Sequence, residues 1–296
     1  MTSFRAVAEA WIASREHCSG SLGRIKFWID QFGDTIISEI SDDDVDQALV
    51  NLERRGKLRG GIGARAGEPT GQPLSGATVN RFVSTLGGIF KYARSVRAVR
   101  RSVIPPTRGI EKYPEPANPD KYLRAEEVDR LITFARVIDS SWRRLPALII
   151  MGYHTGYRIG ALKKLRWRDI DFEDRTATVL TTKNGRPNIV PLTIRCIDEL
   201  NKIPKGPLDE LVFRSDRKRD KAFCHDSLFK KVCKEARLDG RTFHWLRHGC
   251  GSALASAGTS QAQIMAVMGH QTLLASARYM HNNVDDKRAV ISRVFQ

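Results

Sequence analysis

Residues 242–279 read TFHWLRHGCGSALASAGTSQAQIMAVMGHQTLLASARY. If the first half of this stretch is helical, His244, Arg247 and His248 stand at positions i, i+3 and i+4 and share one face. A Gly-His pair follows, and Tyr279 lies nine positions beyond His270. A tyrosine hydroxyl, an arginine and imidazoles suit attack on a phosphodiester, because they provide a nucleophile, an anion clamp and proton carriers. We therefore expect the rest of the chain to supply a second anion clamp, an acid for the leaving group and a surface that holds DNA.

The chain is long enough for two domains and is strongly basic. Its 296 residues include 49 Lys and Arg against 33 Asp and Glu, a net charge of +16, and the pI is near 9.9. Residues 1–50 hold 4 basic and 9 acidic side chains, whereas residues 51–118 hold 13 and 4. This distribution favours a polyanionic partner. A basic surface that serves only solubility is the alternative.

The cysteines and the apolar residues indicate a cytoplasmic protein, associated with the nucleoid if it binds DNA. Five cysteines are scattered along the chain without a CxxC pair, which fits reduced thiols better than disulfides. No apolar run approaches the roughly 20 residues that cross a bilayer. The N-terminal residues have helical periodicity and acidic side chains, so they do not resemble a signal peptide. No membrane partner is expected.

Residues 1–100 are predicted to form a four-helix DNA-binding domain. The first apolar helical stripe, spaced i, i+3, i+4 and i+7, consists of Phe4, Val7, Ala8 and Trp11. Ser41 followed by three aspartates predicts another helix start, and a long amphipathic helix is expected from Thr78 to about Val99. Its polar face is basic and is predicted to contact DNA through Arg81, Lys91, Arg94 and Arg97. The glycine-rich segment 57–77 is either a loop along the phosphate backbone or a tolerated surface insertion.

Residues 101–121 hold five of the twelve prolines, so residues 101–118 are predicted to be an extended linker. Residues 119–283 should then form a second domain made mainly of helices. Two strands are expected at 176–182 and 188–192, joined by a tight turn around Asn184-Gly185. Lys183 and Arg186 would flank that turn. The predicted fold class is therefore mainly α with one small antiparallel β-sheet.

The order of these motifs resembles the tyrosine recombinases, the phage-integrase-like family of site-specific recombinases. That family has T-G-x-R, a lysine on a β-hairpin, H-x-x-R, G-H and a tyrosine nine residues later. The matching residues here are Thr155-Gly156-Tyr157-Arg158, Lys183, His244-Trp245-Leu246-Arg247, Gly269-His270 and Tyr279. The resemblance covers residues 119–281, and the N-terminal part is similar to the family's core-binding domain in layout alone. It implies a clamp of two domains around DNA, with no arm-type DNA-binding domain ahead of it.

The resemblance implies that Tyr279 attacks the scissile phosphorus to give a 3′-phosphotyrosine and a free 5′-hydroxyl. A covalent intermediate retains the energy of the phosphodiester, so resealing needs no ATP. Arg158 and Arg247 would bind the non-bridging oxygens and stabilise the added negative charge of the transition state. Since these arginines supply positive charge, neither a metal ion nor another cofactor is expected.

The remaining polar residues receive the other roles. Lys183 is predicted to protonate the leaving 5′-oxygen, and His244 to be a proton acceptor or a phosphate ligand. His270 is expected to donate a hydrogen bond to the phosphate. We interpret His248 as a core or buttressing histidine. Although His244 and His248 have the spacing of a zinc site, Trp245 stands where the HExxH glutamate would be, and no third ligand is evident.

Three positions near the first arginine need separate comment. Lys163 and Lys164 are expected on a helix beside Arg158, where they would contact phosphates. Ala161 stands where the family often has an acidic residue, and the lack of a supporting carboxylate should loosen the site without abolishing it.

The sequence thus predicts a site-specific DNA recombinase, an integrase of a phage or other mobile element. It would act as a homotetramer on double-stranded attachment sites, with a DNA-bending or directionality factor as a further partner. Residues 284–296 are expected to form a helix that docks on a neighbouring subunit. The alternatives are a chromosome-dimer or plasmid resolvase, a type IB topoisomerase and a non-catalytic DNA-binding regulator.

Overall fold

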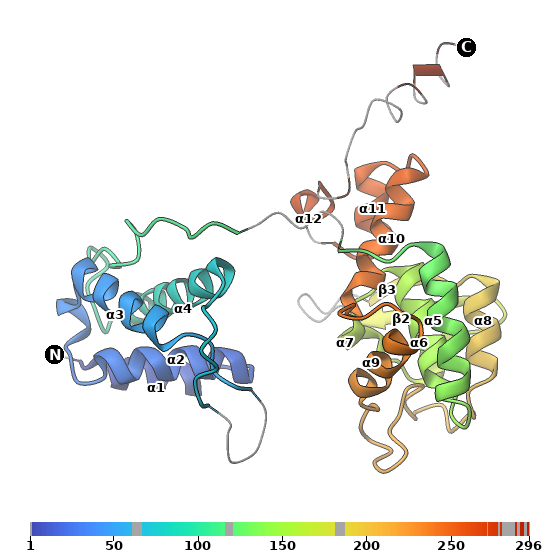
Figure 1. Cartoon of the computed structure of the whole chain (residues 1–296), viewed down its shortest axis with the longest axis horizontal. Coiled ribbons are helices and arrows are strands. Elements are labelled where there is room, and N and C mark those ends of the chain that lie inside the picture. The colour runs from blue at the N-terminus through green and yellow to red at the C-terminus, as the bar shows by residue number, and fades with distance from the viewer. Residues whose placement is uncertain are drawn as a thin grey trace. The chain divides into compact units, whose positions relative to one another are not determined.

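The structure, a computed structural model, describes residues 2–60, 67–115, 121–180, 187–270, 272–277, 279, 288, 291, 292 and 295. The chain divides into two compact units, Met1–Ala117 and Asn118–Gln296 (Figure 1). Each unit has its own cluster of buried apolar side chains. Within the described ranges, no helix is long and apolar enough to cross a membrane.

The first unit is built from helices. Its elements are α1 (Phe4–Ala13), α2 (Ser19–Phe32), the short 3-10 helix η1 (Ile37–Glu39), α3 (Asp42–Arg55) and α4 (Gly76–Ser95). Trp28 is fully buried, and its indole N–H donates to the carbonyl of Phe82 at 2.9 Å, which ties α2 to α4. Ser41 begins α3 through a capping box, since its hydroxyl accepts from the N–H of Asp44 and the Asp44 carboxylate accepts from the N–H of Ser41.

Helix α4 ends earlier than the sequence predicts. The N–H of Ala98 donates to the carbonyl of Ala93 at 2.9 Å, and Arg97 takes a left-handed conformation with φ 58°. This is the hydrogen-bond pattern of a Schellman motif, which closes a helix. Arg97 therefore lies beyond the helix, while Arg81 and Lys91 are exposed on it and Arg94 is half-buried.

The glycine-rich segment after α3 returns on itself as a hairpin. The N–H of Lys57 donates to the carbonyl of Gln72, and the N–H of Arg59 donates to that of Glu68, both at 2.8 Å. The tip of this hairpin, residues 61–66, lies outside the described residues.

Part of the proline-rich segment that the sequence predicts as an extended linker packs on the first unit. Val103, Ile110 and Tyr113 pack against the core of that unit. Asn80 on α4 holds the main chain of Tyr113 at both ends, donating to its carbonyl at 3.0 Å and accepting from its N–H at 2.9 Å. The apolar side chains of Val103, Ile110 and Tyr113 are therefore partly buried, whereas Ile104 is exposed.

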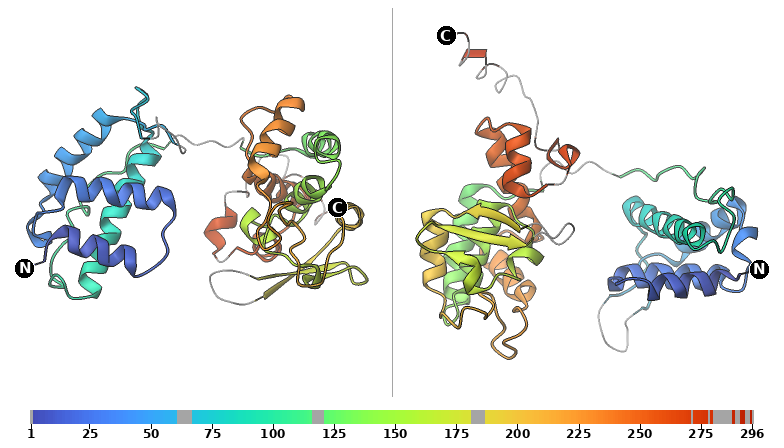
Figure 2. Two further views of the ribbon diagram at one scale, coloured as in Figure 1. Left: turned by 90° about the horizontal axis from the view of Figure 1, so that it is seen from below. Right: turned by 180° about the vertical axis from the view of Figure 1, so that it is seen from behind.

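The second unit combines helices with one small sheet. Its helices are α5 (Ala125–Ile138), α6 (Arg144–Thr155), α7 (Ile159–Leu162), the 3-10 helix η2 (Trp167–Asp169), α8 (Ile194–Asn201), α9 (His225–Glu235), α10 (His244–Ser256), α11 (Gln261–Met268) and α12 (Leu273–Ala277). Every residue from Leu145 to Met151 on α6 is buried, so this helix forms the centre of the core. Figure 2 shows the sheet lying against one side of these helices. The predicted fold class, mainly α with a small antiparallel sheet, is confirmed.

The sheet has the antiparallel order β1 (Ile170–Asp171), β2 (Thr176–Leu180) and β3 (Pro187–Pro191). The two-residue strand β1 was not predicted. β2 and β3 pair from Thr176 opposite Pro191 to Leu180 opposite Pro187. The predicted turn around Asn184-Gly185, and with it Lys183 and Arg186, lies outside the described residues.

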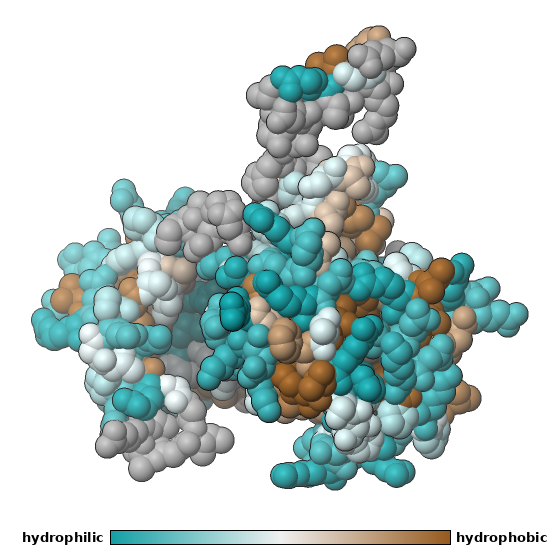
Figure 3. All heavy atoms as spheres, turned by 45° about the vertical axis from the view of Figure 1, so that its right-hand side comes forward, coloured by the Kyte–Doolittle hydropathy of each residue, from teal (hydrophilic) through white to brown (hydrophobic). Residues whose placement is uncertain are grey.

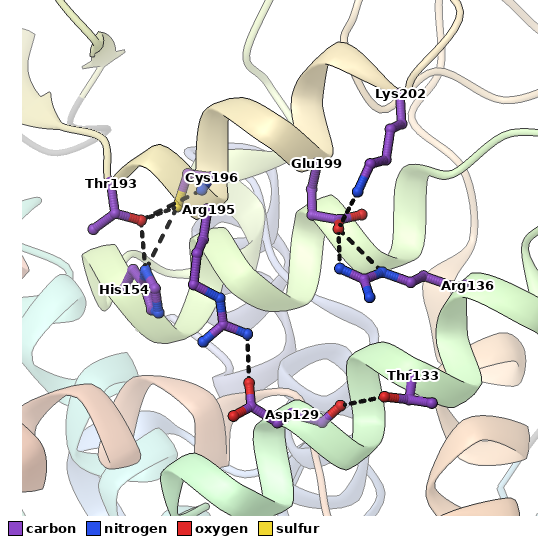
Figure 4. Close-up of polar contacts among 9 residues, drawn as sticks. All are labelled: Asp129, Thr133, Arg136, His154, Thr193, Arg195, Cys196, Glu199 and Lys202. Atoms are coloured by element: carbon purple, nitrogen blue, oxygen red, sulfur yellow. Dashed lines mark hydrogen bonds and ion pairs between the residues drawn. The ribbon is translucent and has the colours of Figure 1, made fainter.

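Polar contacts brace α8 against α5 and α6 (Figure 4). The carboxylate of Glu199 on α8 is 3% exposed and accepts hydrogen bonds from Arg136 on α5 and from Lys202. The imidazole Nδ1 of His154, at the end of α6, lies 2.7 Å from the hydroxyl of Thr193, which caps α8. Burial lowers the pKa of His154 below its ordinary value. These contacts hold the segment that leads from α6 toward residues 156–158.

The described surface is mainly polar. On the face drawn in Figure 3, hydrophilic residues predominate and apolar patches lie between them. The most exposed large apolar side chains of the second unit come from different parts of the chain: Val137 on α5, Ile189 on β3, Ile194 on α8, Leu208 in a loop and Phe295 near the C-terminus. Exposed apolar side chains from separate elements do not by themselves mark a binding surface.

Candidate active site

Arg247 joins the three motif segments of the second unit. Its side chain is 4% exposed on α10, and its Nη1 donates to the carbonyls of Gly156 and Met268, the latter at 2.9 Å. Gly156 lies two residues before Arg158, and Met268 lies two residues before His270. One guanidinium therefore holds the H-x-x-R helix, the T-G-x-R turn and the G-H turn together.

The other end of the same guanidinium is charged and unpaired among the described residues. Burial, with a further contribution from Arg158, lowers the pKa of Arg247 to about 10, so the group is still protonated at neutral pH. Its Nη2 is buried and has no hydrogen-bond partner among the described residues. Leaving a buried donor unpaired typically costs about 1–3 kcal/mol, and more for a charged group. An oxygen of a bound phosphate would remove that cost.

Arg158 stands at the start of α7, as the T-G-x-R pattern predicts. Gly156 ends α6 in the left-handed region with φ 64°, and a Cβ at this position would lie 3.0 Å from the sulfur of Cys250. The turn therefore packs directly on α10, which only a glycine allows here. Arg158 caps α7 with an extended backbone, and its side chain is exposed.

Tyr279 lies almost buried against α10. Its side chain is 7% exposed, and its hydroxyl oxygen is 3.0 Å from Nδ1 of His248. Its ring packs over Gly251, where a Cβ would come within 2.6 Å of the ring carbons. The ring of His270 lies nearly parallel to it, with 6.2 Å between centroids and 7° between planes. Helix α10 therefore orients the tyrosine as well as carrying Arg247.

A serine that the sequence analysis missed orients His270. The hydroxyl of Ser276 is fully buried and lies 2.7 Å from Nδ1 of His270. The carbonyl of Ser276 accepts from the N–H of Tyr279 at 3.1 Å, so one residue fixes both neighbours. Its signal in the sequence is weak: a single hydroxyl within the apolar run 273–277, three positions before the tyrosine.

The histidines of α10 differ in their surroundings. His244 is exposed at the start of the helix, whereas His248 is half-buried one turn later. Their rings meet edge to face with centroids 4.6 Å apart. His248, which the sequence assigns to buttressing, is therefore the histidine that contacts the hydroxyl of Tyr279.

A second contact missed from the sequence ties the β2–β3 hairpin to the T-G-x-R turn. Asn188 on β3 donates its side-chain N–H to the hydroxyl of Tyr157, the residue before Arg158. Burial raises the pKa of Tyr157 to about 12, so this hydroxyl stays protonated at neutral pH. The described base of the hairpin that carries Lys183 is thus anchored next to the first arginine.

The remaining predicted positions are placed as follows. Lys163 and Lys164 come directly after α7 and not within it, the first half-buried and the second exposed. Ala161 is half-buried on α7 and packs against the core. Within the described part of the chain, no three His, Cys, Asp or Glu side chains come together as a metal site. The gathered groups are therefore arginines, imidazoles and a phenol, which suit phosphoryl transfer.

Comparison with known proteins gives the family. Residues 121–286 match the sequence model of the Phage integrase family. A shufflon-specific DNA recombinase of Escherichia coli is 27% identical over 213 residues, which are 72% of this chain and 53% of that protein. The chain spans about half the length of such curated relatives.

Solved structures share the fold. The integrase of the Tn1549 transposon, in complex with transposon right-end DNA, aligns over 100% of both chains with a TM-score of 0.73 and 17% identity. A lambda integrase in a tetramer bound to a Holliday junction aligns over 92% of this chain and 78% of its own, with a TM-score of 0.64 and 19% identity. Because the family model alone covers more than half of the sequence, the chain belongs to the phage integrase family, the tyrosine recombinases.

Proposed function

We propose that this chain is a site-specific DNA recombinase that cuts and rejoins strands through a 3′-phosphotyrosine, without a metal ion and without ATP. The observation that carries the proposal is the buried guanidinium of Arg247. It holds the segments of Arg158 and His270 through main-chain carbonyls and keeps Nη2 without a partner in the described residues. Tyr279 packs on the same helix, so a phosphate held by Nη2 would be near a hydroxyl nucleophile.

In the proposed cleavage step, the hydroxyl oxygen of Tyr279 forms a bond to phosphorus while the bond to the 5′-oxygen breaks. The tyrosine proton passes to a base, with His244 as acceptor or as phosphate ligand, and Lys183 protonates the leaving oxygen. Arg158, Arg247 and His270 bind the non-bridging oxygens as the negative charge grows. Removing one such donor typically lowers the rate by about 10²–10³.

In the proposed rejoining step, a 5′-hydroxyl of the exchanged strand attacks the phosphotyrosine and releases Tyr279. One phosphodiester replaces another, so the covalent intermediate supplies the energy that ATP would otherwise provide. Two guanidinium groups provide the positive charge that a metal ion would bring, and their planar forks match the geometry of phosphate oxygens.

The role proposed is that of an integrase of a phage or other mobile element. The names of similar proteins support it, since they include a shufflon recombinase, a transposon integrase and lambda integrase. We propose double-stranded attachment sites as substrate, a homotetramer on DNA as found for lambda integrase, a bending or directionality factor as accessory partner, and the cytoplasm as location. The basic residues proposed to contact DNA are Arg81, Lys91, Arg94, Arg97, Lys163, Lys164 and Arg186.

The test is the formation of a covalent protein–DNA adduct on nicked suicide DNA that carries the mobile element's own attachment site. Wild-type protein should form an adduct that survives SDS and forms in EDTA, and Tyr279→Phe should form none. Adducts that persist in Tyr279→Phe would assign the wrong tyrosine. If wild-type protein bound the site specifically but formed no adduct, the proposed function would change from a recombinase to a DNA-binding regulator. Relaxation of supercoiled DNA that lacks a site would indicate a topoisomerase.

A further inference from the structure

The nucleophile of the proposed reaction has a hydrogen-bond partner that the sequence did not assign to chemistry. Nδ1 of His248 lies 3.0 Å from the hydroxyl oxygen of Tyr279, within the range for proton transfer. The two ring centroids are 6.0 Å apart and the ring planes are tilted by 55°, so the rings are not stacked. The oxygen that would attack phosphorus is thus already at hydrogen-bond distance from an imidazole nitrogen.

We propose that His248 is the catalytic base that accepts the proton of Tyr279 during strand cleavage. This inference rests on the phosphotyrosine reaction proposed above and deepens it. It separates the two roles left open for His244, which then serves as a phosphate ligand. Its exposed position at the start of α10 suits that role.

The packing around the phenol favours His248 over the other imidazole beside it. His270 lies parallel to the tyrosine ring, and its Nδ1 is 2.7 Å from the buried hydroxyl of Ser276. His248, in contrast, directs its Nδ1 at the hydroxyl itself. The absence of a side chain at Gly251, one turn after His248 on α10, allows the ring to lie against the helix. The turn of α10 from His248 to Gly251 thus sets the distance between Nδ1 of His248 and the hydroxyl of Tyr279.

The proton and electron movements balance. As the Tyr279 oxygen bonds to phosphorus, its proton moves to Nδ1 of His248. The electron pair of the breaking bond stays on the 5′-oxygen, which takes a proton from Lys183. In rejoining, Lys183 takes back the proton of the attacking 5′-hydroxyl, and the imidazolium of His248 returns its proton to Tyr279 as the phosphotyrosine bond breaks. No oxidant, reductant or metal takes part in the step.

Other titratable groups surround this pair and belong in any interpretation of its pH dependence. They are His244, whose ring contacts His248 on α10, Arg247, which interacts electrostatically with Tyr279, and His270, whose ring lies nearly parallel to that of Tyr279. A control at His244 is therefore needed, because its titration would also reach His248.

The experiment compares His248→Asn, His244→Asn and Lys183→Ala on two suicide substrates, one ordinary and one with sulfur at the bridging 5′ position. An asparagine places an amide atom near the site of Nδ1 but does not take up a proton. A sulfur leaving group departs without protonation, so it rescues a missing acid and not a missing base. We expect His248→Asn to lose about 10²-fold in adduct formation on both substrates. Lys183→Ala should be rescued by sulfur.

The pH profile separates a base from a residue that merely holds the ring. Wild-type cleavage should fall on acidification from pH 8 to pH 5, because a protonated imidazole accepts no proton. Cleavage by His248→Asn should instead keep rising above pH 8, because a growing fraction of the phenol ionises by itself. His244→Asn should retain the wild-type shape of the profile while its rate is lower at every pH.

Four results would overturn the assignment: His248→Asn cutting at the wild-type rate, its rescue by sulfur, a loss of the acidic limb in His244→Asn alone, or a flat wild-type profile. The last needs no variant, so the test stands even if His248→Asn fails to fold, which thermal unfolding would reveal. The proposed function fails differently, since wild-type protein would then form no adduct on either substrate. That outcome would overturn both the phosphotyrosine reaction and the assignment of His248 as its base.

Discussion

Gly251→Ala should displace Tyr279, the proposed nucleophile, while leaving intact the helix against which Tyr279 packs. The added Cβ would lie 2.6 Å from the edge of the Tyr279 ring that bears the hydroxyl. An ordinary carbon–carbon contact is about 3.5 Å, so the ring must retreat by about 1 Å. That movement breaks the 3.0 Å contact between the hydroxyl and His248. A misplacement of about 1 Å at a reacting centre can cost about 10²-fold in rate, and we expect a loss of that size.

The assay is the rate of adduct formation on suicide DNA, measured alongside DNA affinity and the midpoint of thermal unfolding. Gly160→Ala is the matched control, since no atom lies within 4 Å of its added Cβ. Both substitutions place alanine in a helix, which favours the helix by about 0.5–1 kcal/mol. Affinity should stay at the wild-type value in both variants. If Gly251→Ala formed the adduct at the wild-type rate, the view that Tyr279 reacts from this position against α10 would be refuted.

Two further predictions concern charge. Arg247→Lys should lower adduct formation by about 10² or more and also lower the unfolding midpoint, because one ammonium cannot replace a fork that binds two carbonyls and, in the proposed reaction, a phosphate. Arg158→Lys, at an exposed position, should lower adduct formation alone. Equal falls of the two unfolding midpoints in calorimetry would contradict this prediction. Burial lowers the pKa of His154, so below pH of about 6.5 the unfolded chain binds more protons than the folded one and stability falls on acidification. His154→Asn should lose less stability between pH 7 and pH 5 in urea unfolding, and an unchanged loss would show that this histidine is not the cause.

The periodic parts of the fold were predictable. Apolar spacing located the helices of the first unit, and the capping signal at Ser41 began α3 as expected. Boundaries set by tertiary contacts were not predictable. Local sequence does not reveal that Arg97 would leave α4 in a left-handed turn, or that Tyr113 would dock on the first unit through Asn80. The contact between Asn80 and Tyr113 joins residues 33 positions apart, beyond any periodic pattern.

The motifs identified the charged side chains of the candidate site but not the residues that orient them. Arg158, Arg247 and Tyr279 stand in patterns with fixed spacing. Ser276 and His248 act through geometry that no spacing specifies, since each depends on how the chain returns to α10 after α12. The predicted roles of Lys183 and Arg186 remain predictions, because both lie outside the described residues.

The bonds from Arg247 to the carbonyls of Gly156 and Met268 also make the site depend on the folding of two other segments. Both carbonyls lie where helices end, α6 at Gly156 and α11 at Gly269, so the guanidinium can make both bonds only when both turns are formed. A nascent or partly degraded chain that lacks either turn would carry all the same side chains without their clamp. For a protein proposed to cut DNA strands, strand cleavage would then require that the second unit has folded completely.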